Sequence, residues 1–326
     1  MGDVLHVNEL IIGSKVSMVL ALVSVKECAD NTLSCEFKDV TGSIVGTVRD
    51  MSLYNSLKTQ TGGAVKLTAV VKPGENRKPM LAVKTICTAD KSEYKSSDLF
   101  DGLSKEKIEE YIALISDLKR HIKNPGYKSL VDAALNEPTL EKLSQMPATL
   151  GYYGRYRGGA LAGSAVVAEM VKQTGCTYVT HFNALHAGNI DWSLLLTAAL
   201  LNTLGVINYI TPEAPFTKTA VGIERGYVSV LQSIIEKTVY SNNIEISDLD
   251  VSRLLNTIGC SVSKRTAVRA TSKEGILLRH TLAMYAELDM FDFGLSELQP
   301  VDDENGSGYL YNASLNRYVH GGEKGA

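Results

Sequence analysis

Hydrophobic and polar positions alternate in short runs along the first part of the chain, which is the pattern of half-buried strands. These runs lie at residues 15–25, 33–39, 43–49, 64–72 and 79–86. Glycine and proline clusters separate them, and residues 52–57 suit a short helix between the third and fourth runs. Five strands with one helix in that place predict an OB-fold β-barrel.

From residue 104 the apolar spacing changes to the period of amphipathic helices. Ser104 can cap a first helix that buries Ile108, Ile112 and Ile115. Further helical patterns cover residues 127–135, 140–145, 161–174, 192–204, 224–240, 248–258 and 273–288. The fold class that we expect is therefore α+β and multidomain, with an N-terminal five-stranded OB-fold barrel followed by an all-α helical domain.

Shifts in composition indicate where the domains end. Residues 91–102 are polar, as in a linker, so we expect the barrel at 1–90 and a linker with the first helix at 91–125. The helical domain is then expected at 126–298. Residues 299–326 are rich in Gly, Asn and Asp, which predicts a flexible C-terminal tail.

The bulk composition narrows the class of protein. The chain has 326 residues, of which 44% are hydrophobic, as in a soluble globular protein. A net charge of −3 excludes a uniformly basic coat, so any binding of phosphate must use local positive patches. Five scattered cysteines without a C-x-x-C pair favour a reducing compartment. The N-terminus has no secretory pattern and the longest apolar run, at 194–201, is short for a membrane span, so we expect a cytoplasmic protein.

Several stretches are informative when their order is considered together. They are Phe37-Lys38-Asp39-Val40-Thr41-Gly42, Val48-Arg49-Asp50, Tyr153-Gly154-Arg155-Tyr156-Arg157-Gly158-Gly159 and Ala199-Leu200-Leu201-Asn202-Thr203-Leu204-Gly205. In order and spacing the chain resembles the YhaM-like bacterial 3′-to-5′ exoribonucleases, which join an OB-fold to an HD-type phosphohydrolase domain, over roughly residues 10–290. The resemblance implies that the helical domain is HD-like, a fold that holds divalent metals with imidazoles and a His-Asp pair.

The positions that match the family's metal ligands hold other residue types in this chain. The His-Asp pair is matched by Asn202 and Thr203, and the ligand after the Gly-Gly turn by Gly163. The matched positions are Tyr152, Tyr153, Gly163, Asn202, Thr203, Tyr227, Thr257 and Ile258, with a last one near Leu282 or Ala283. Such side chains do not rebuild a hard-cation site. The resemblance therefore implies a pseudo-nuclease without metal, cofactor or catalytic residues.

Two local patches remain able to bind nucleic acid. In the barrel, the candidates for stacking on bases or pairing with phosphates are Phe37, Arg49, Tyr54, Lys66, Lys72, Arg77, Lys78 and Lys84. In the helical domain they are Tyr153, Arg155, Tyr156, Arg157, Arg253, Lys264, Arg265 and Arg269. Three alternatives stay open: the lysines only protect strand edges from aggregation, Phe37 belongs to the core, and the basic helical stretches are ordinary solvated segments.

These features lead to one main hypothesis of function and two alternatives. The main one is a non-catalytic protein that binds single-stranded RNA, or single-stranded DNA, with low sequence specificity and protects or escorts mRNA. The alternatives are a residual metal-dependent 3′-to-5′ exoribonuclease and an oligomeric scaffold protein. The resemblance also implies a homo-oligomer in a bacterial cell, and a phage origin is a further hypothesis.

Overall fold

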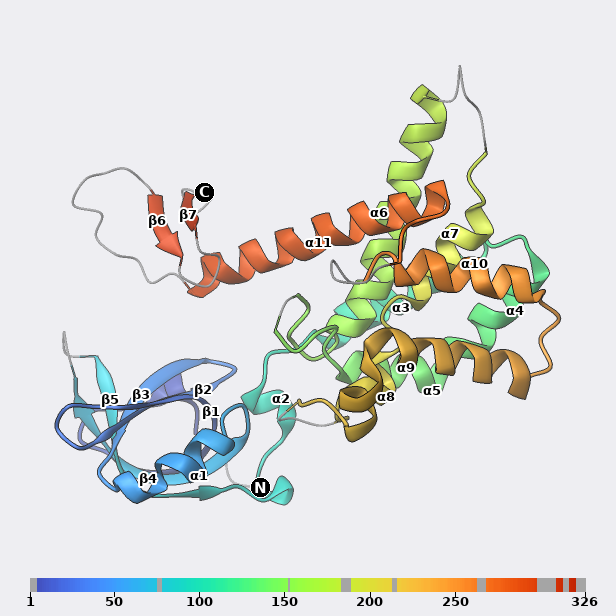
Figure 1. Ribbon diagram of the computed structural model, residues 1–326. Coiled ribbons are helices and arrows are strands. Elements are labelled where there is room, and N and C mark those ends of the chain that lie inside the picture. Colours follow the sequence, from blue (N-terminus) through green and yellow to red (C-terminus); the bar gives the residue numbers. More distant parts are fainter. Residues whose placement is uncertain are drawn as a thin grey trace. The chain divides into compact units, whose positions relative to one another are not determined.

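The computed structural model describes residues 5–74, 78–151, 153–182, 189–212, 216–262, 268–297, 309–312 and 317–320. It divides into two compact units, which are coloured along the chain in Figure 1. Unit 1 consists of Met1–Gly102 with Ile210–Thr219, and unit 2 of Leu103–Tyr209 with Ala220–Ala326.

Unit 1 contains a closed barrel of five strands in the order β1-β2-β3-β5-β4 (Figure 1). The strands are β1 (Lys15–Glu27), β2 (Leu33–Asp39), β3 (Gly42–Val48), β4 (Ala64–Pro73) and β5 (Pro79–Thr88). The turn η2 (Met51–Leu53) and helix α1 (Tyr54–Thr59) connect β3 to β4. This confirms the predicted five-stranded barrel with a helix between its third and fourth strands, the connectivity expected of an OB-fold.

The barrel core forms because inward positions alternate with outward ones. Along β2 every second residue is buried, and these residues are Leu33, Cys35, Phe37 and Asp39. The ring of Phe37 is 0% exposed, and a Cβ atom on Gly46 of β3 would lie 2.8 Å from Phe37 Cε2. Glycine at position 46 thus makes room for the ring. The prediction that Phe37 stacks on a base is wrong, because its alternating position turns the ring into the core.

Asp39 is a buried carboxylate that ties the N-terminal segment to the barrel. It accepts hydrogen bonds from the backbone N–H of Val7 at 2.8 Å, from the N–H and hydroxyl of Thr41 at 2.7 and 2.6 Å, and from the N–H of Gly42 at 3.2 Å. His6 Nδ1 lies 3.2 Å from the same carboxylate. Burial by itself would raise the pKa of Asp39, but the donors from Thr41, Val7 and His6 lower it below its ordinary value.

Replacing Asp39 with asparagine should lower the free energy of unfolding of the barrel by about 1–3 kcal/mol at neutral pH. The depressed pKa adds a pH dependence: the stabilisation is complete above the unfolded value of 3.8 and is lost as pH falls through the folded value. Urea unfolding at pH 7 and pH 3 should therefore separate the wild type from Asp39→Asn at pH 7 much more than at pH 3. Glu27→Gln, at an exposed position on β1, is the control and should be nearly neutral. An equal gap at both pH values would contradict this account.

Unit 2 is built from helices around the buried helix α7. The helices are α3 (Lys105–Lys119), α4 (Pro125–Ala134), α5 (Glu137–Gln145), α6 (Gly159–Phe182), α7 (Trp192–Leu201), α8 (Val206–Tyr209), α9 (Ala220–Ser241), α10 (Asp248–Gly259) and α11 (Lys273–Glu297). Helices α4, α6, α10 and α11 pack against α7. The apolar segment Trp192–Tyr209 is long enough to cross a membrane, but 78% of it is buried inside the protein, as in the core helix of a globular unit.

The unit boundaries differ from the predicted ones. Residues up to Gly102 cluster with the barrel, where Leu99 of the short helix α2 (Ser96–Leu99) packs with Ala21 and Ala64. Helix α3 packs against α6 and therefore belongs to the helical unit instead of a linker at 91–125. In the expected tail, β6 (Tyr309–Asn312) and β7 (Arg317–His320) form an antiparallel pair. Composition alone does not distinguish a polar connection from one that is anchored by a single apolar residue such as Leu99.

Candidate nucleic-acid interface

One outward face of the barrel, formed by β1, β4 and β5, gathers most of the basic residues of the described barrel strands. The register places Ser17 opposite Thr68, and Thr68 opposite Thr85. From these positions the side chains alternate between the inside and the outside of the barrel along each strand. The outward positions are Lys15, Ser17, Val19, Lys66, Thr68, Val70, Lys72, Met80, Ala82, Lys84, Thr85 and Cys87. We call this set the lysine face. These strand positions include four lysines and no Asp or Glu.

Local geometry positions two of these lysines. Thr68 pairs with Thr85 but Ala69 pairs with Val83, so Lys84 is the extra residue of a β-bulge, and its side chain is exposed. Lys66 Nζ lies 2.5 Å from Glu93 Oε1, and this hydrogen bond raises the pKa of Lys66. Lys66 is thus partly neutralised by an acid from the following turn η4 (Lys91–Glu93).

The other three lysines of the face carry charge that no carboxylate of the described residues offsets. Lys15, Lys72 and Lys84 form no ion pair with any of the residues that the structure describes. Between them the hydroxyls of Thr68 and Thr85 lie 2.6 Å apart and offer polar atoms on the same surface. Lys15 was not among the predicted residues, since only the strand register shows that it faces the same side as β4 and β5. Lys78, which was predicted, is exposed beside the β4–β5 turn, and Arg77 lies outside the described residues.

The outer side of β2 and β3 differs from the lysine face in its charge. Lys38 Nζ lies 2.5 Å from Asp101, and Glu36 accepts a hydrogen bond from Ser24 on the neighbouring strand. Arg49 is exposed just beyond the end of β3, and Tyr54 is half-buried at the start of α1. Strands 2 and 3 are the usual binding face of OB-folds. In this barrel the outer side of β2 and β3 carries charges of both signs, and the lysine face lies on β1, β4 and β5.

In unit 2 a tight turn precedes α6 and contains the predicted basic and aromatic stretch. Gly154 and Gly158 have φ angles of +56° and +90°, which favour glycine. A Cβ atom on Gly159 would lie 2.1 Å from the carbonyl oxygen of Gly154. The N–H of Ala148 donates to that same oxygen at 2.8 Å, and the N–H of Gly154 donates to Asp289 at 2.8 Å. These contacts fix the turn against α11.

The tyrosines of this stretch belong to a packed aromatic cluster. Tyr153 is 9% exposed, and its ring contacts Tyr285 edge to face with centroids 5.7 Å apart. Tyr227 and Tyr209 make a similar contact at 5.5 Å. Burial raises the pKa of Tyr156 to about 12 and raises that of Tyr227 and Tyr285 as well. The prediction that Tyr153 stacks on a base is therefore wrong, and Tyr156 is held largely inside the unit by the same packing.

Several of the positions that the sequence resemblance aligned with metal ligands come together beside this cluster. A Cβ atom on Gly163 would lie 3.0 Å from Thr203 Cγ2 and 3.9 Å from Tyr153 Cε2. The hydroxyl of Tyr227 donates to the carbonyl oxygen of Asn202. Tyr153, Gly163, Asn202–Thr203 and Tyr227 thus meet here, from three parts of the sequence. Thr257 and Ile258 are buried in α10, which packs on α7, and Tyr152 lies outside the described residues.

The side chains in that place do not fit a metal centre. Gly163 offers no donor, and the Thr203 hydroxyl donates to the carbonyl of Ala160 at 2.9 Å while Ser164 lies 2.6 Å away. The Asn202 amide donates to the Ala199 carbonyl at 2.5 Å, and its buried Oδ1 has no partner among the described residues. One neutral amide oxygen does not hold a divalent cation. Within the described ranges no group of three or more His, Cys, Asp or Glu side chains comes together.

The basic residues predicted to bind nucleic acid in unit 2 differ in their exposure and in the charges beside them. Arg155 and Arg157 are half-buried in the turn before α6. Arg253 lies 3.7 Å from Asp191 and 3.6 Å from Asp250, so two carboxylates offset its charge. Arg269 is exposed, and Lys264 and Arg265 lie outside the described residues. Residues 251–273 contain no Asp or Glu in the sequence. Arg253 is nevertheless a weaker candidate for a phosphate contact than its place in this acid-free stretch indicates, because Asp191 and Asp250 lie close to it.

No protein-family model and no curated protein matches the chain. Among solved structures, the chain is similar to asparaginyl-tRNA synthetase from Pyrococcus horikoshii complexed with asparaginyl-adenylate, at 13% sequence identity over 78% of this chain and 72% of that one. The TM-score of 0.24 is too low for this likeness to indicate a shared fold or function.

Proposed function

We propose that this chain binds single-stranded RNA through the lysine face of its barrel, with little sequence specificity, and that it does not cleave the strand. The observation that carries the proposal is the convergence of Lys15, Lys66, Lys72 and Lys84 on one face of three adjacent strands, where Lys66 is paired with Glu93 and the other three form no ion pair with the described residues. A row of ammonium groups attracts a phosphate backbone by releasing its counterions.

The residue types on the lysine face indicate which parts of a nucleic acid it can contact. The lysine face carries no aromatic ring, so base stacking contributes little and the phosphates supply most of the affinity. Hydroxyls at Ser17, Thr68 and Thr85 can donate to phosphate oxygens between the lysines. Neither group distinguishes one base from another. The proposed protein therefore coats or escorts a strand, such as an mRNA, without reading its sequence.

We further propose that unit 2 is a degenerate HD-like domain. The meeting of Tyr153, Gly163, Thr203 and Tyr227 supports this, since the resemblance matches all four to ligand positions of one metal site. Tyrosine packing and an internal hydroxyl network occupy the place, which supports the proposal that catalysis is lost. Incubating labelled RNA with the protein and Mn²⁺ or Mg²⁺ tests this part: progressive shortening of the strand would contradict it.

Neutralising two lysines of the face tests the binding part of the proposal. Lys72→Gln/Lys84→Gln should weaken binding of a fluorescein-labelled single-stranded RNA, measured by polarisation. The slope of log affinity against log salt should become shallower by about 1.4, since each phosphate contact contributes about 0.7 for single strands.

The matched control is Lys26→Gln/Lys58→Gln, which removes the same charge from two exposed positions of unit 1 that are not among the residues of the lysine face. It should leave the salt slope nearly unchanged. Equal loss of affinity in both double variants would mean that net charge alone, and not this face, determines binding. Stronger binding to single-stranded DNA of the same sequence would assign the face to DNA.

A further inference from the structure

The turn that precedes β1 holds two adjacent isoleucines at the surface of the barrel. Ile11 and Ile12 are 73% and 46% exposed. Gly13 has a φ angle of +95°, which favours glycine at this position of the turn. The N–H and the hydroxyl of Ser14 both donate to the carbonyl oxygen of Ile11, at 3.1 and 2.7 Å. Hydrogen bonds within the turn thus fix the backbone that carries the two apolar side chains.

Backbone pairing places this turn at one end of the lysine face. The N–H of Gly13 donates to the carbonyl oxygen of Val71 at 2.8 Å, and the N–H of Val71 donates to that of Ser14 at 2.9 Å. Lys15 follows Ser14 at the start of β1, and Lys72 follows Val71 near the end of β4. Both lysines belong to the lysine face and form no ion pair with the described residues. Exposed aliphatic groups and two lysines therefore lie at the same end of the barrel.

We propose that Ile11 and Ile12 contact the bases of the strand whose phosphates the lysine face binds, and that this contact makes the protein prefer a single strand to a duplex. The inference rests on the proposed function and adds a second kind of contact to it. Apolar side chains such as isoleucine pack against bases and insert between them. They offer no hydrogen-bonding group, so the contact does not depend on which base is present.

Phosphate contacts alone would not select a single strand. Each contact contributes about 0.9 to the salt slope on a duplex, against about 0.7 on a single strand, because the duplex carries the denser charge. Base faces are accessible only where the strand is unpaired, so an apolar contact with them favours the single strand. Val70 and Met80 of the lysine face are half-buried, so the turn with Ile11 offers the more accessible apolar surface.

An anionic membrane is the other partner that attracts basic and apolar groups together, but two features favour a nucleic acid. Membrane binding increases with the apolar area that is buried, and two side chains on one turn supply little of it. The lysines also continue away from the turn along β4. Lys66 and Lys72 are six positions apart, which corresponds to about 20 Å at 3.3 Å per residue. Such a line of charge suits an extended strand that ends at the isoleucines.

Fluorescence polarisation of the full chain with two labelled strands of equal length tests the proposal. One is a single-stranded RNA, and the other is an abasic strand that keeps the phosphates and lacks the bases. The wild type should bind the RNA about tenfold more tightly, as expected when roughly one apolar side chain leaves water. Ile11→Ser/Ile12→Ser should bind both strands equally and lose the preference for single-stranded over duplex RNA. Its salt slope should equal that of the wild type, because no lysine is removed.

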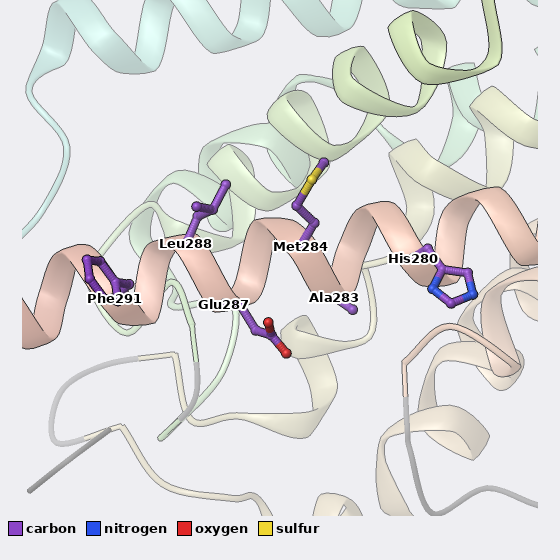
Figure 2. Close-up of a pocket in the computed structure, with 6 residues that line it drawn as sticks. All are labelled: His280, Ala283, Met284, Glu287, Leu288 and Phe291. Carbon is purple, nitrogen blue, oxygen red and sulfur yellow. The ribbon is translucent and has the colours of Figure 1, made fainter. Parts of the chain in front are cut away.

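The matched control is Met284→Ser/Leu288→Ser, in unit 2. These side chains are 47% and 56% exposed and line an open hollow on α11, together with other residues of that helix (Figure 2). This variant should keep the tenfold preference for RNA. Urea unfolding of Ile11→Ser/Ile12→Ser should show nearly wild-type stability, since both isoleucines are exposed.

The same titrations separate failure of this inference from failure of the proposed function. A wild type that binds both strands equally, with affinity that falls as salt rises, would overturn the contact with bases and leave the lysine face standing. No binding of either strand would overturn both. Loss of the preference in the control variant would overturn the assignment to Ile11 and Ile12. The assignment would also be overturned if Ile11→Ser/Ile12→Ser kept its RNA preference but lost binding to phosphatidylserine vesicles, because the turn would then serve a lipid surface.

Discussion

Replacing Phe37 with alanine should lower the free energy of unfolding of the barrel by about 3–5 kcal/mol, the cost of removing a large buried ring. The ring is fully buried, and glycine at position 46 of the neighbouring strand has no side chain that could fill the space left by the ring. The largest loss of protection should appear by hydrogen exchange in β2 and β3. This is one of the two largest effects that we expect.

Phe37→Leu separates packing from binding. Leucine keeps most of the apolar volume, so this variant should fold, with a smaller loss of stability. Its affinity for single-stranded RNA should equal that of the wild type, because the ring does not reach solvent. A folded Phe37→Leu protein with markedly weaker RNA binding would mean that the ring contacts bases after all.

Replacing Gly159 with alanine should destabilise the helical unit by about 3 kcal/mol or more, above the usual cost of overpacking. The new methyl group would lie 2.1 Å from the Gly154 oxygen and 2.7 Å from its carbonyl carbon. Both are backbone atoms, which a rotamer change does not move away. The turn must open, and the hydrogen bonds from Ala148 and to Asp289 are then lost.

The only tryptophan of the chain provides a readout for this variant. Trp192 begins α7, and its ring lies where a Cβ on Gly175 of α6 would be 2.9 Å away. Its fluorescence during urea unfolding therefore reports on unit 2. Gly151→Ala is the control, because nothing lies within 4 Å of a Cβ at that exposed position. Similar midpoints for both glycine variants would contradict the description of this turn.

The strands and helices could be predicted from sequence because their signals are local. Leu33–Asp39 was predicted to the residue from its alternation, and α10 was predicted to within one residue of its observed end. The caps provided by Ser104, Asn124 and Asp191 lie where short polar residues precede apolar periods. Each of these signals lies within a few residues of the element that it determines.

The site was harder to predict because it depends on pairing between distant strands and on burial. Lys15 joins the lysine face through the register between β1 and β4, which no local pattern specifies. Phe37 and Tyr153 have the residue types that stack on bases, but packing turns both rings inward. Arg253 lies in an acid-free stretch of sequence, yet Asp191, 62 positions earlier, comes close to it. The type of a residue indicates what its side chain could bind, but the fold determines whether that side chain is exposed to a ligand.

Titration of unmodified protein into labelled single-stranded RNA at several salt concentrations tests the central claim most directly. Three to four phosphate contacts predict binding at low salt whose log affinity falls with a slope of about −2 to −3 against log salt. The RNA recovered after incubation with Mg²⁺ or Mn²⁺ should be of full length. No binding at low salt, binding that is insensitive to salt, or a shortened strand would contradict the account.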